Sequence, residues 1–237
     1  MGIVITSGGK LRKEKKLPPP KVRAGYLQDL LARMQSEENL PRPKGAEKSS
    51  EFTVSFQAHR EAERLNDLVV LSQIPEFVTA AKSADDFGDL CFVLCWLFHN
   101  TKSARVAKEL GRLLERVPAK RNFLRRVSIP LQYAPNAITR AFALKFIPNS
   151  DYDVEGNALA VLGAVKKPDD FKRLDDLLFS KRLHECNLWH CVGAIAQIGG
   201  NRSVPVLKKF VEMHKKNRRW EYQQAVEWAE EELESLS

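Results

Sequence analysis

The 237-residue sequence has no apolar segment that approaches the roughly 20 residues of a membrane-spanning helix. It also lacks a secretory signal, because the apolar opening at 3–5 is far shorter than the core of about 7 to 15 residues that such a signal needs, and no cleavage site follows. Four cysteines (Cys91, Cys95, Cys186 and Cys191) are too few for a secreted disulfide scaffold and fit reduced thiols better. These absences predict a cytoplasmic protein without a transmembrane segment.

Catalytic motifs are absent as well. The chain contains no glycine-rich phosphate loop, no Gly-x-Ser-x-Gly elbow and no His-Glu-x-x-His pair. The paired carboxylates at 169–170 and 175–176 fit the start and the solvent face of one helix, where aspartate complements the helix dipole. The sequence therefore predicts no catalytic residue and no cofactor.

The residues near His184 are a candidate metal-binding site. His184, Cys186 and His190 lie within seven residues, but no fourth ligand is nearby. Cys191 falls on the apolar stripe of a helix expected at 187–198, about 100° around the helix from His190, so the two point in different directions. We interpret Cys191 and Cys95 as buried structural thiols and predict no metal.

The net charge of +8 is unevenly distributed. Residues 1–50 hold 11 Lys/Arg and 5 Asp/Glu, giving +6, whereas residues 51–237 hold 27 and 25, giving only +2. Within that second part the charge alternates in blocks: −5 for 51–101, +9 for 102–145, −2 for 146–185, +6 for 186–219 and −6 for 220–237. Alternating blocks are suited to a protein partner of complementary charge.

The first 50 residues predict a disordered, basic and proline-rich arm, because segments such as "GGKLRKEKKLPPPK" cannot bury enough apolar surface to offset chain entropy. One short amphipathic helix is expected at about 22–35, from the apolar spacing of Leu27, Leu30, Leu31 and Met34. It could dock on its own body or in a partner's groove. The opening "MGIVIT" also matches a myristoylation pattern, with Gly2 as the acceptor.

From about residue 51 onward the periodicity is helical. The expected helices are 56–72, 75–83, 86–99, 103–117, 120–128, 136–147, 154–165, 169–180, 187–198, 203–216 and 220–235. Glycines and prolines fall between these segments, and the turns are short, which is typical of helical hairpins.

Three of the hairpins superpose on Leu97, Leu162 and Ile198, with a small residue (Cys95, Ala160 and Ala196) two positions before each anchor. The last two anchors are 36 residues apart, and the wider first interval leaves room for one degenerate unit at about 120–150. In the last hairpin Gly199 or Gly200 can close one helix, Ser203 can cap the next, and Pro205 fits its first turn.

The segments "ALAVLGAV" (158–165) and "AIAQIGGNRSVPVLKKF" (194–210) resemble HEAT-like repeats of the bilin-lyase type, over roughly residues 85–216. The resemblance implies an all-α fold, a right-handed α-solenoid of HEAT-like helical hairpins over 51–237. Such repeats occur in scaffolds, nucleic-acid binders and a few enzymes. The pair at 184–185 is similar to the His-Glu pairs of the HEAT-like iron hydroxylase of deoxyhypusine, but that family needs several pairs and this chain has one.

We expect a non-enzymatic protein-interaction or adaptor module. The alternative is a nucleic-acid binder that uses an arginine-rich face at 102–126, and a HEAT-like lyase or glycosylase comes last. Trp220 and Trp228 are expected to serve as core and end-cap residues. The candidate partner-binding residues, called the basic stripe below, lie opposite the apolar side of their helices: Arg105, Arg112, Arg116, Arg121 and Arg125.

Overall fold

The structure is a computed structural model that describes residues 17–41 and 50–236. Apart from an isolated bridge between Asn39 and Thr53, the secondary structure of these residues is helical, which confirms the all-α expectation. The α-helices are α1 (Tyr26–Met34), α2 (Val54–Ala62), α3 (Ile74–Ala80), α4 (Ala84–Thr101), α5 (Ala104–Arg116), α6 (Arg121–Ser128), α7 (Ala137–Ala143), α8 (Tyr152–Val165), α9 (Asp170–Leu178), α10 (Leu188–Gly199), α11 (Val204–His214) and α12 (Trp220–Ser235). Short 3₁₀ helices lie between them: η1 (Ser50–Phe52), η2 (Leu68–Ser72), η3 (Ile129–Tyr133), η4 (Leu144–Phe146), η5 (Glu185–Asn187) and η6 (Gly200–Ser203). None of the described helices combines the length and the apolar character needed to cross a membrane.

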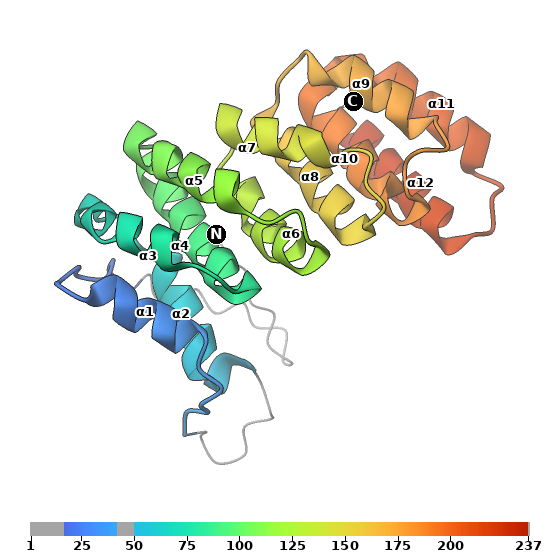
Figure 1. The fold of residues 1–237 in the computed structure, drawn as a ribbon. Helices are drawn as coiled ribbons and strands as arrows, with labels where there is room; N and C mark the ends of the chain where they lie inside the picture. Colours follow the sequence, from blue (N-terminus) through green and yellow to red (C-terminus); the bar gives the residue numbers. More distant parts are fainter. Residues whose placement is uncertain (1–16, 42–49, 237) are drawn as a thin grey trace.

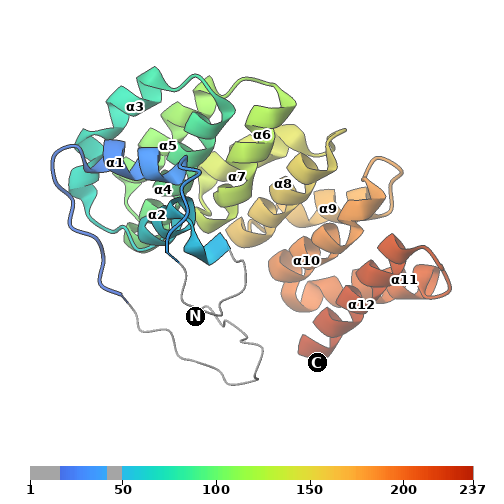
Figure 2. The same cartoon turned by 90° about the horizontal axis from the view of Figure 1, so that it is seen from below.

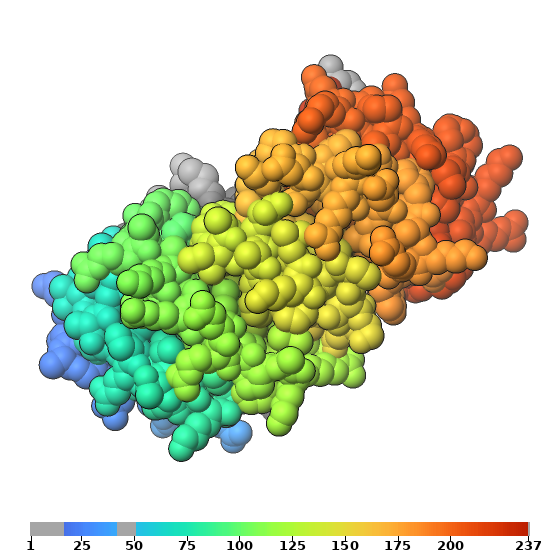
Figure 3. All heavy atoms as spheres, turned by 45° about the horizontal axis from the view of Figure 1, so that its top comes forward, coloured from blue at the N-terminus to red at the C-terminus, as the bar shows by residue number. Residues whose placement is uncertain are grey.

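The helices follow one another along the molecule in chain order (Figures 1 and 3). Helices α4, α6, α8, α10 and α12 pack on one another in succession and form a row, called the central row below. Each of the alternate helices packs on a member of this row: α5 on α4, α7 on α8, α9 on α10 and α11 on α12. Figure 2 shows the two ends of the arrangement, with α1 and α2 at one end and α11 and α12 at the other.

Helix α4 shows how local side chains set the ends of a central-row helix. The Ser83 hydroxyl accepts the N–H of Asp86 (3.0 Å), and the Asp86 carboxylate accepts the N–H of Ser83 (2.9 Å), so a capping box satisfies two amide groups at the helix start. Lys102 ends the helix in the left-handed conformation, with a φ of 52°. Between these ends α4 is buried around most of its circumference, as a helix covered by neighbours on several sides should be.

The single helix expected at 56–72 is wrong, because the chain breaks it into α2 and η2. The Asn100 side chain donates to the carbonyl oxygens of Glu63 and Leu65 (both 2.9 Å), which removes these acceptors from a continuing helix. The Asp67 carboxylate then accepts the N–H of Val69 (2.9 Å) and starts η2. Apolar periodicity alone does not reveal such a break, since Leu65 remains fully buried within it.

Helix α1 packs on the chain's own body, which answers the question of where the short amphipathic helix docks. Its apolar side is buried against α2 and α4 through Leu27, Leu30 and Met34. The Ser55 hydroxyl donates to the Met34 carbonyl (2.6 Å), and Arg33 pairs with the Glu61 carboxylate of α2 (2.9 Å). Of the expected arm, residues 1–16, which include Gly2, and residues 42–49 lie outside the described part.

The residues chosen as anchors of the expected repeat lie in the core. The anchors Leu97 and Leu162 are fully buried, Ile198 nearly so, and the thiols of Cys95 and Cys191 lie in the core as expected. Gly200 rather than Gly199 takes the positive φ, at 52°. The region of the expected degenerate unit at about 120–150 holds α6, η3, α7 and η4.

Two expectations about single side chains at the C-terminal end are wrong. Ser203 occupies the cap position of α11, yet its hydroxyl donates to the Gly200 carbonyl within η6 and does not cap the helix. Trp220 is 59% exposed and is therefore no core residue. Trp228 does pack inward, 5.5 Å from the ring of Trp189 on α10, and so fits the end-cap role.

Candidate partner-binding surface

The basic stripe is divided between two helices. Arg105, Arg112 and Arg116 lie on α5, and Arg121 and Arg125 lie on α6. The opposite side of α5 is buried, as expected, through Val106, Leu110, Leu113 and Leu114. The helical register predicted for α5 is therefore correct, and the surroundings of each guanidinium decide which arginines are free to contact a partner.

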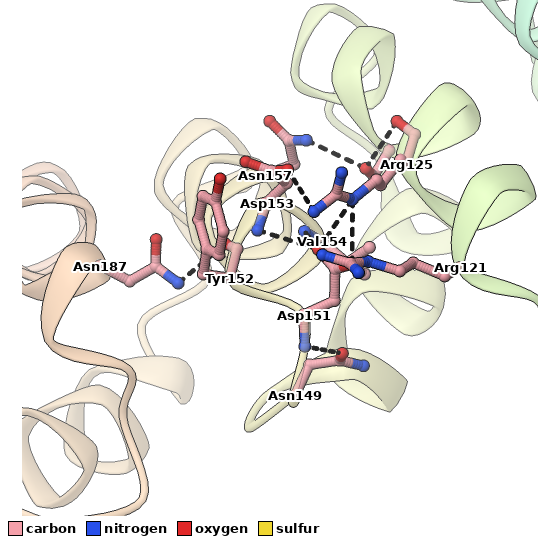
Figure 4. A network of polar contacts seen from close by, with 10 residues as sticks. Arg121, Arg125, Asn149, Asp151, Tyr152, Asp153, Val154, Asn157 and Asn187 are labelled. Carbon is pink, nitrogen blue, oxygen red and sulfur yellow. Dashed lines mark hydrogen bonds and ion pairs between the residues drawn. The ribbon is translucent and has the colours of Figure 1, made fainter.

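The two α6 arginines of the basic stripe bind carboxylates at the start of α8 (Figure 4). Asp151 forms an ion pair with Arg121 and accepts a hydrogen bond from Arg125 Nε (2.9 Å), and Arg125 also pairs with Asp153 (2.8 Å). Asp151 at the same time caps α8, since its carboxylate accepts the N–H groups of Asp153 (3.1 Å) and Val154 (3.2 Å). One carboxylate thus joins the start of one helix to the side chains of another.

Asp151 is a nearly buried anion, with a side chain that is 9% exposed. Burial by itself raises the pKa of this carboxyl, but the hydrogen bonds from Arg125, Arg121 and the amide of Val154 outweigh it and hold the pKa below its ordinary value. The carboxylate is therefore charged at neutral pH. The two arginines are its counter-ions, and their charge is not available to a partner to the same extent as that of a free side chain.

Similar pairs join other neighbouring hairpins, and we call the set the ion-pair ladder. Its members are Arg126 with Asp85 (2.6 Å), Arg121 and Arg125 with Asp151 and Asp153, Arg140 with Asp170 (2.6 Å), and Arg219 with Glu185. In each pair the arginine and the carboxylate come from different charge blocks of the sequence. Positive and negative blocks that alternate along the sequence thus neutralise each other where their helices meet. These charges are then a weaker argument for a charged partner.

The α5 arginines have different surroundings. The side chain of Arg105 makes no hydrogen bond or ion pair with any described residue. Arg116 donates to the Thr79 carbonyl (3.2 Å), and Arg112 pairs with Glu109 (2.8 Å), a carboxylate that is only 14% exposed. Arg112 is thus partly committed to its own helix, whereas Arg105 and Arg116 keep their full charge at the surface.

An open hollow of about 420 Å³ lies beside Arg105, and we call it the η2 hollow. Its wall comes from η2 through Leu68, Val69, Leu71 and Ser72. Val69 is 60% exposed, which places it among the most exposed large apolar side chains of the described chain. The sequence reasoning missed this surface because it assigned the whole of 56–72 to one helix.

The residues once weighed as metal ligands link α8, α10 and α12 instead. The His184 ring packs on Tyr152 (5.6 Å), and Glu185 pairs with Arg219 and accepts from Tyr222. His190 stacks on Trp189, and burial lowers its pKa to about 4, so it is neutral at pH 7. No group of three or more His, Cys, Asp or Glu side chains in the described ranges could hold a metal ion.

A buried polar cluster beneath His184 was also missed. Glu155 of α8 is fully buried and accepts the N–H groups of Asn149 and His184 (both 3.1 Å) and the side-chain amide of Asn187 (2.8 Å). Asn187 donates in addition to the Tyr152 carbonyl (2.9 Å). These contacts fix the loops before α8 and α10. A glutamate among apolar residues in "DVEGNALAV" was the available signal.

A scan against models of known protein families gives no match to this chain, and a search of the curated proteins finds no significant similarity.

Proposed function

We propose that this protein is a non-enzymatic interaction module, a right-handed α-solenoid of HEAT-like hairpins that presents the exposed face of α5 to a protein partner. The packing of central-row helices in chain order supports the solenoid. The free thiols of all four cysteines support a cytoplasmic setting. The partner-binding residues in this proposal are Arg105 and Arg116, with Arg112 in a lesser role.

The observation that carries the proposal is the division of the basic stripe. A groove for nucleic acid needs a continuous row of uncompensated cations along the phosphate backbone. Here Arg121 and Arg125 are neutralised by Asp151 and Asp153, and the α5 face carries two carboxylates, Glu109 and Glu115, among its cations. A face of mixed charge is more compatible with a protein surface than with a polyanion.

Affinity capture with quantitative mass spectrometry tests the proposal. The full chain and the double variant Arg105→Glu with Arg116→Glu are compared with a matched control, Lys181→Glu with Arg182→Glu, which reverses two exposed cations between α9 and η5. We expect at least one protein to be retained by the wild type and the control and lost with the α5 variant.

Nucleic acid is the competing outcome. Binding of a labelled DNA duplex and of single-stranded RNA is measured by fluorescence anisotropy over a range of salt concentrations. Log affinity that falls against log salt at about −0.9 per phosphate contacted, with a slope reduced by about one for each reversed arginine, would replace the proposal by nucleic-acid binding. The absence of any α5-dependent protein partner would also contradict it.

A further inference from the structure

The η2 hollow has a rigid apolar wall. The Asp67 carboxylate accepts the N–H of Val69 (2.9 Å), and the Ser72 hydroxyl donates to the Val69 carbonyl (2.8 Å), so both backbone polar groups of Val69 are bonded within the turn. Val70 is fully buried and Leu71 nearly so, which anchors η2 in the core. The backbone of Val69 is therefore fixed, and more than half of its apolar side chain faces the solvent.

The cations near this hollow lie on α5 and just before it, and one of them lines it. Arg105 lines it, and Lys108 lies one turn further along the same side of α5, with its exposed side chain free of any hydrogen bond or ion pair to the described residues. Lys102 is also exposed, just before the start of α5, and its ammonium lies over the Phe98 ring. The rim therefore favours an anion on the α5 side.

We propose that the η2 hollow receives an aliphatic side chain of the protein partner, next to acidic side chains that pair with Arg105 and Lys108. This inference rests on the proposed function and specifies the chemistry of the partner. An aliphatic group in the hollow removes the apolar surface of Val69 from water, and adjacent carboxylates neutralise the free cations. A phosphate backbone has no side chain that fills such a hollow.

The probe is a phage-displayed library of random dodecapeptides, selected on the immobilised full chain. Enriched peptides are synthesised, labelled and titrated by fluorescence anisotropy against wild type, Val69→Asp and Arg105→Glu. The matched controls are Ile129→Asp, which changes an apolar side chain of similar exposure (52%), and Arg182→Glu, which reverses a distant exposed arginine. Circular dichroism and thermal unfolding verify that each variant is folded.

We expect enriched peptides that combine an aliphatic residue with acidic neighbours, and affinities about tenfold weaker for Val69→Asp and for Arg105→Glu but unchanged for both controls. The inference is overturned if no peptide is enriched, if the enriched peptides lack acidic residues, or if they bind Val69→Asp as tightly as wild type. Binding to vesicles containing phosphatidylserine that is lost in Val69→Asp would also overturn it, in favour of a membrane surface.

The two proposals can fail separately. A captured protein that is lost with the α5 double variant but retained by Val69→Asp leaves the interaction module intact and removes the hollow from it. If the wild type retains no protein in an α5-dependent way, the proposed function itself is wrong.

Discussion

Helices α5 and α6 are adjacent in the sequence and both carry arginines on their polar sides, yet these arginines have different surroundings. On α6, Arg121 and Arg125 meet the carboxylates of Asp151 and Asp153 from the next hairpin. On α5, Arg105 meets none, and it borders an apolar hollow instead. The comparison teaches that a basic sequence segment can supply either the contacts between hairpins or a surface for a partner, and that its charge count does not distinguish the two.

Reversing the α6 charges should give the largest effect. Arg121→Glu with Arg125→Glu leaves the nearly buried carboxylate of Asp151 without a counter-ion and places like charges beside it. We expect the free energy of unfolding to fall by more than in any other variant described below, because Asp151 is nearly buried and would face two new negative charges. Urea denaturation followed by circular dichroism measures it. A loss below about 0.5 kcal/mol would mean that α6 is as free as α5.

Protonation of the Asp151 carboxylate at low pH should lower the stability of the protein by an intermediate amount. Because the pKa of Asp151 is lower in the folded protein than in the unfolded chain, where it is about 3.9, its contribution to stability is complete above pH 4 and is lost as the pH falls through the folded pKa. Asp151→Asn retains a good helix cap but not the charge, and should cost about 1 kcal/mol at pH 7.

Thermal unfolding of wild type and Asp151→Asn between about pH 2 and pH 7 supplies the measurement. The difference in stability between the two proteins should shrink below about pH 4, because the wild-type carboxyl then becomes neutral as well. A difference that stays constant down to the lowest pH would show that the ion pair contributes nothing. Other carboxyls, such as Asp86, titrate alike in both proteins and cancel in the comparison.

Reversing the charges on α5 should have the smallest effect on stability. Arg105→Glu with Lys108→Glu changes two exposed side chains that form no hydrogen bond or ion pair with a described residue, and a glutamate near a helix start interacts favourably with the helix dipole. We expect the free energy of unfolding to change by no more than about 0.5 kcal/mol in the same urea assay. A larger loss would show that this face is packed and would remove it as a binding surface.

The all-α class and most of the helices were predictable because the evidence for them is local. The spacing of Val106, Leu110, Leu113 and Leu114 defines the buried side of α5 without reference to any other helix. The break between α2 and η2 was not predictable in this way, because the Asn100 side chain that captures two carbonyl groups comes from another helix.

The candidate site was only half predictable for the same reason. Periodicity correctly placed all five arginines away from the apolar side of their helices. It carried no information on what faces them, since Asp151 is 30 residues from Arg121 in the sequence. The pair of Arg112 with Glu109 has the local i,i+3 spacing and could have been found. Arginines that pair with a neighbouring helix can therefore be told from unpaired ones only when the three-dimensional packing of the helices is known.

The packing of each helix on helices close to it in the chain also bears on how the protein forms during synthesis. The contacts of the central row join α4 to α6, α6 to α8, α8 to α10 and α10 to α12, so within the described residues each helix of the row packs on a row member close to it in the sequence. Contacts that are local in sequence have a low loop-closure cost and form quickly. Folding can therefore advance from α4 toward α12 as the chain leaves the ribosome, with each finished hairpin serving as the template for the next.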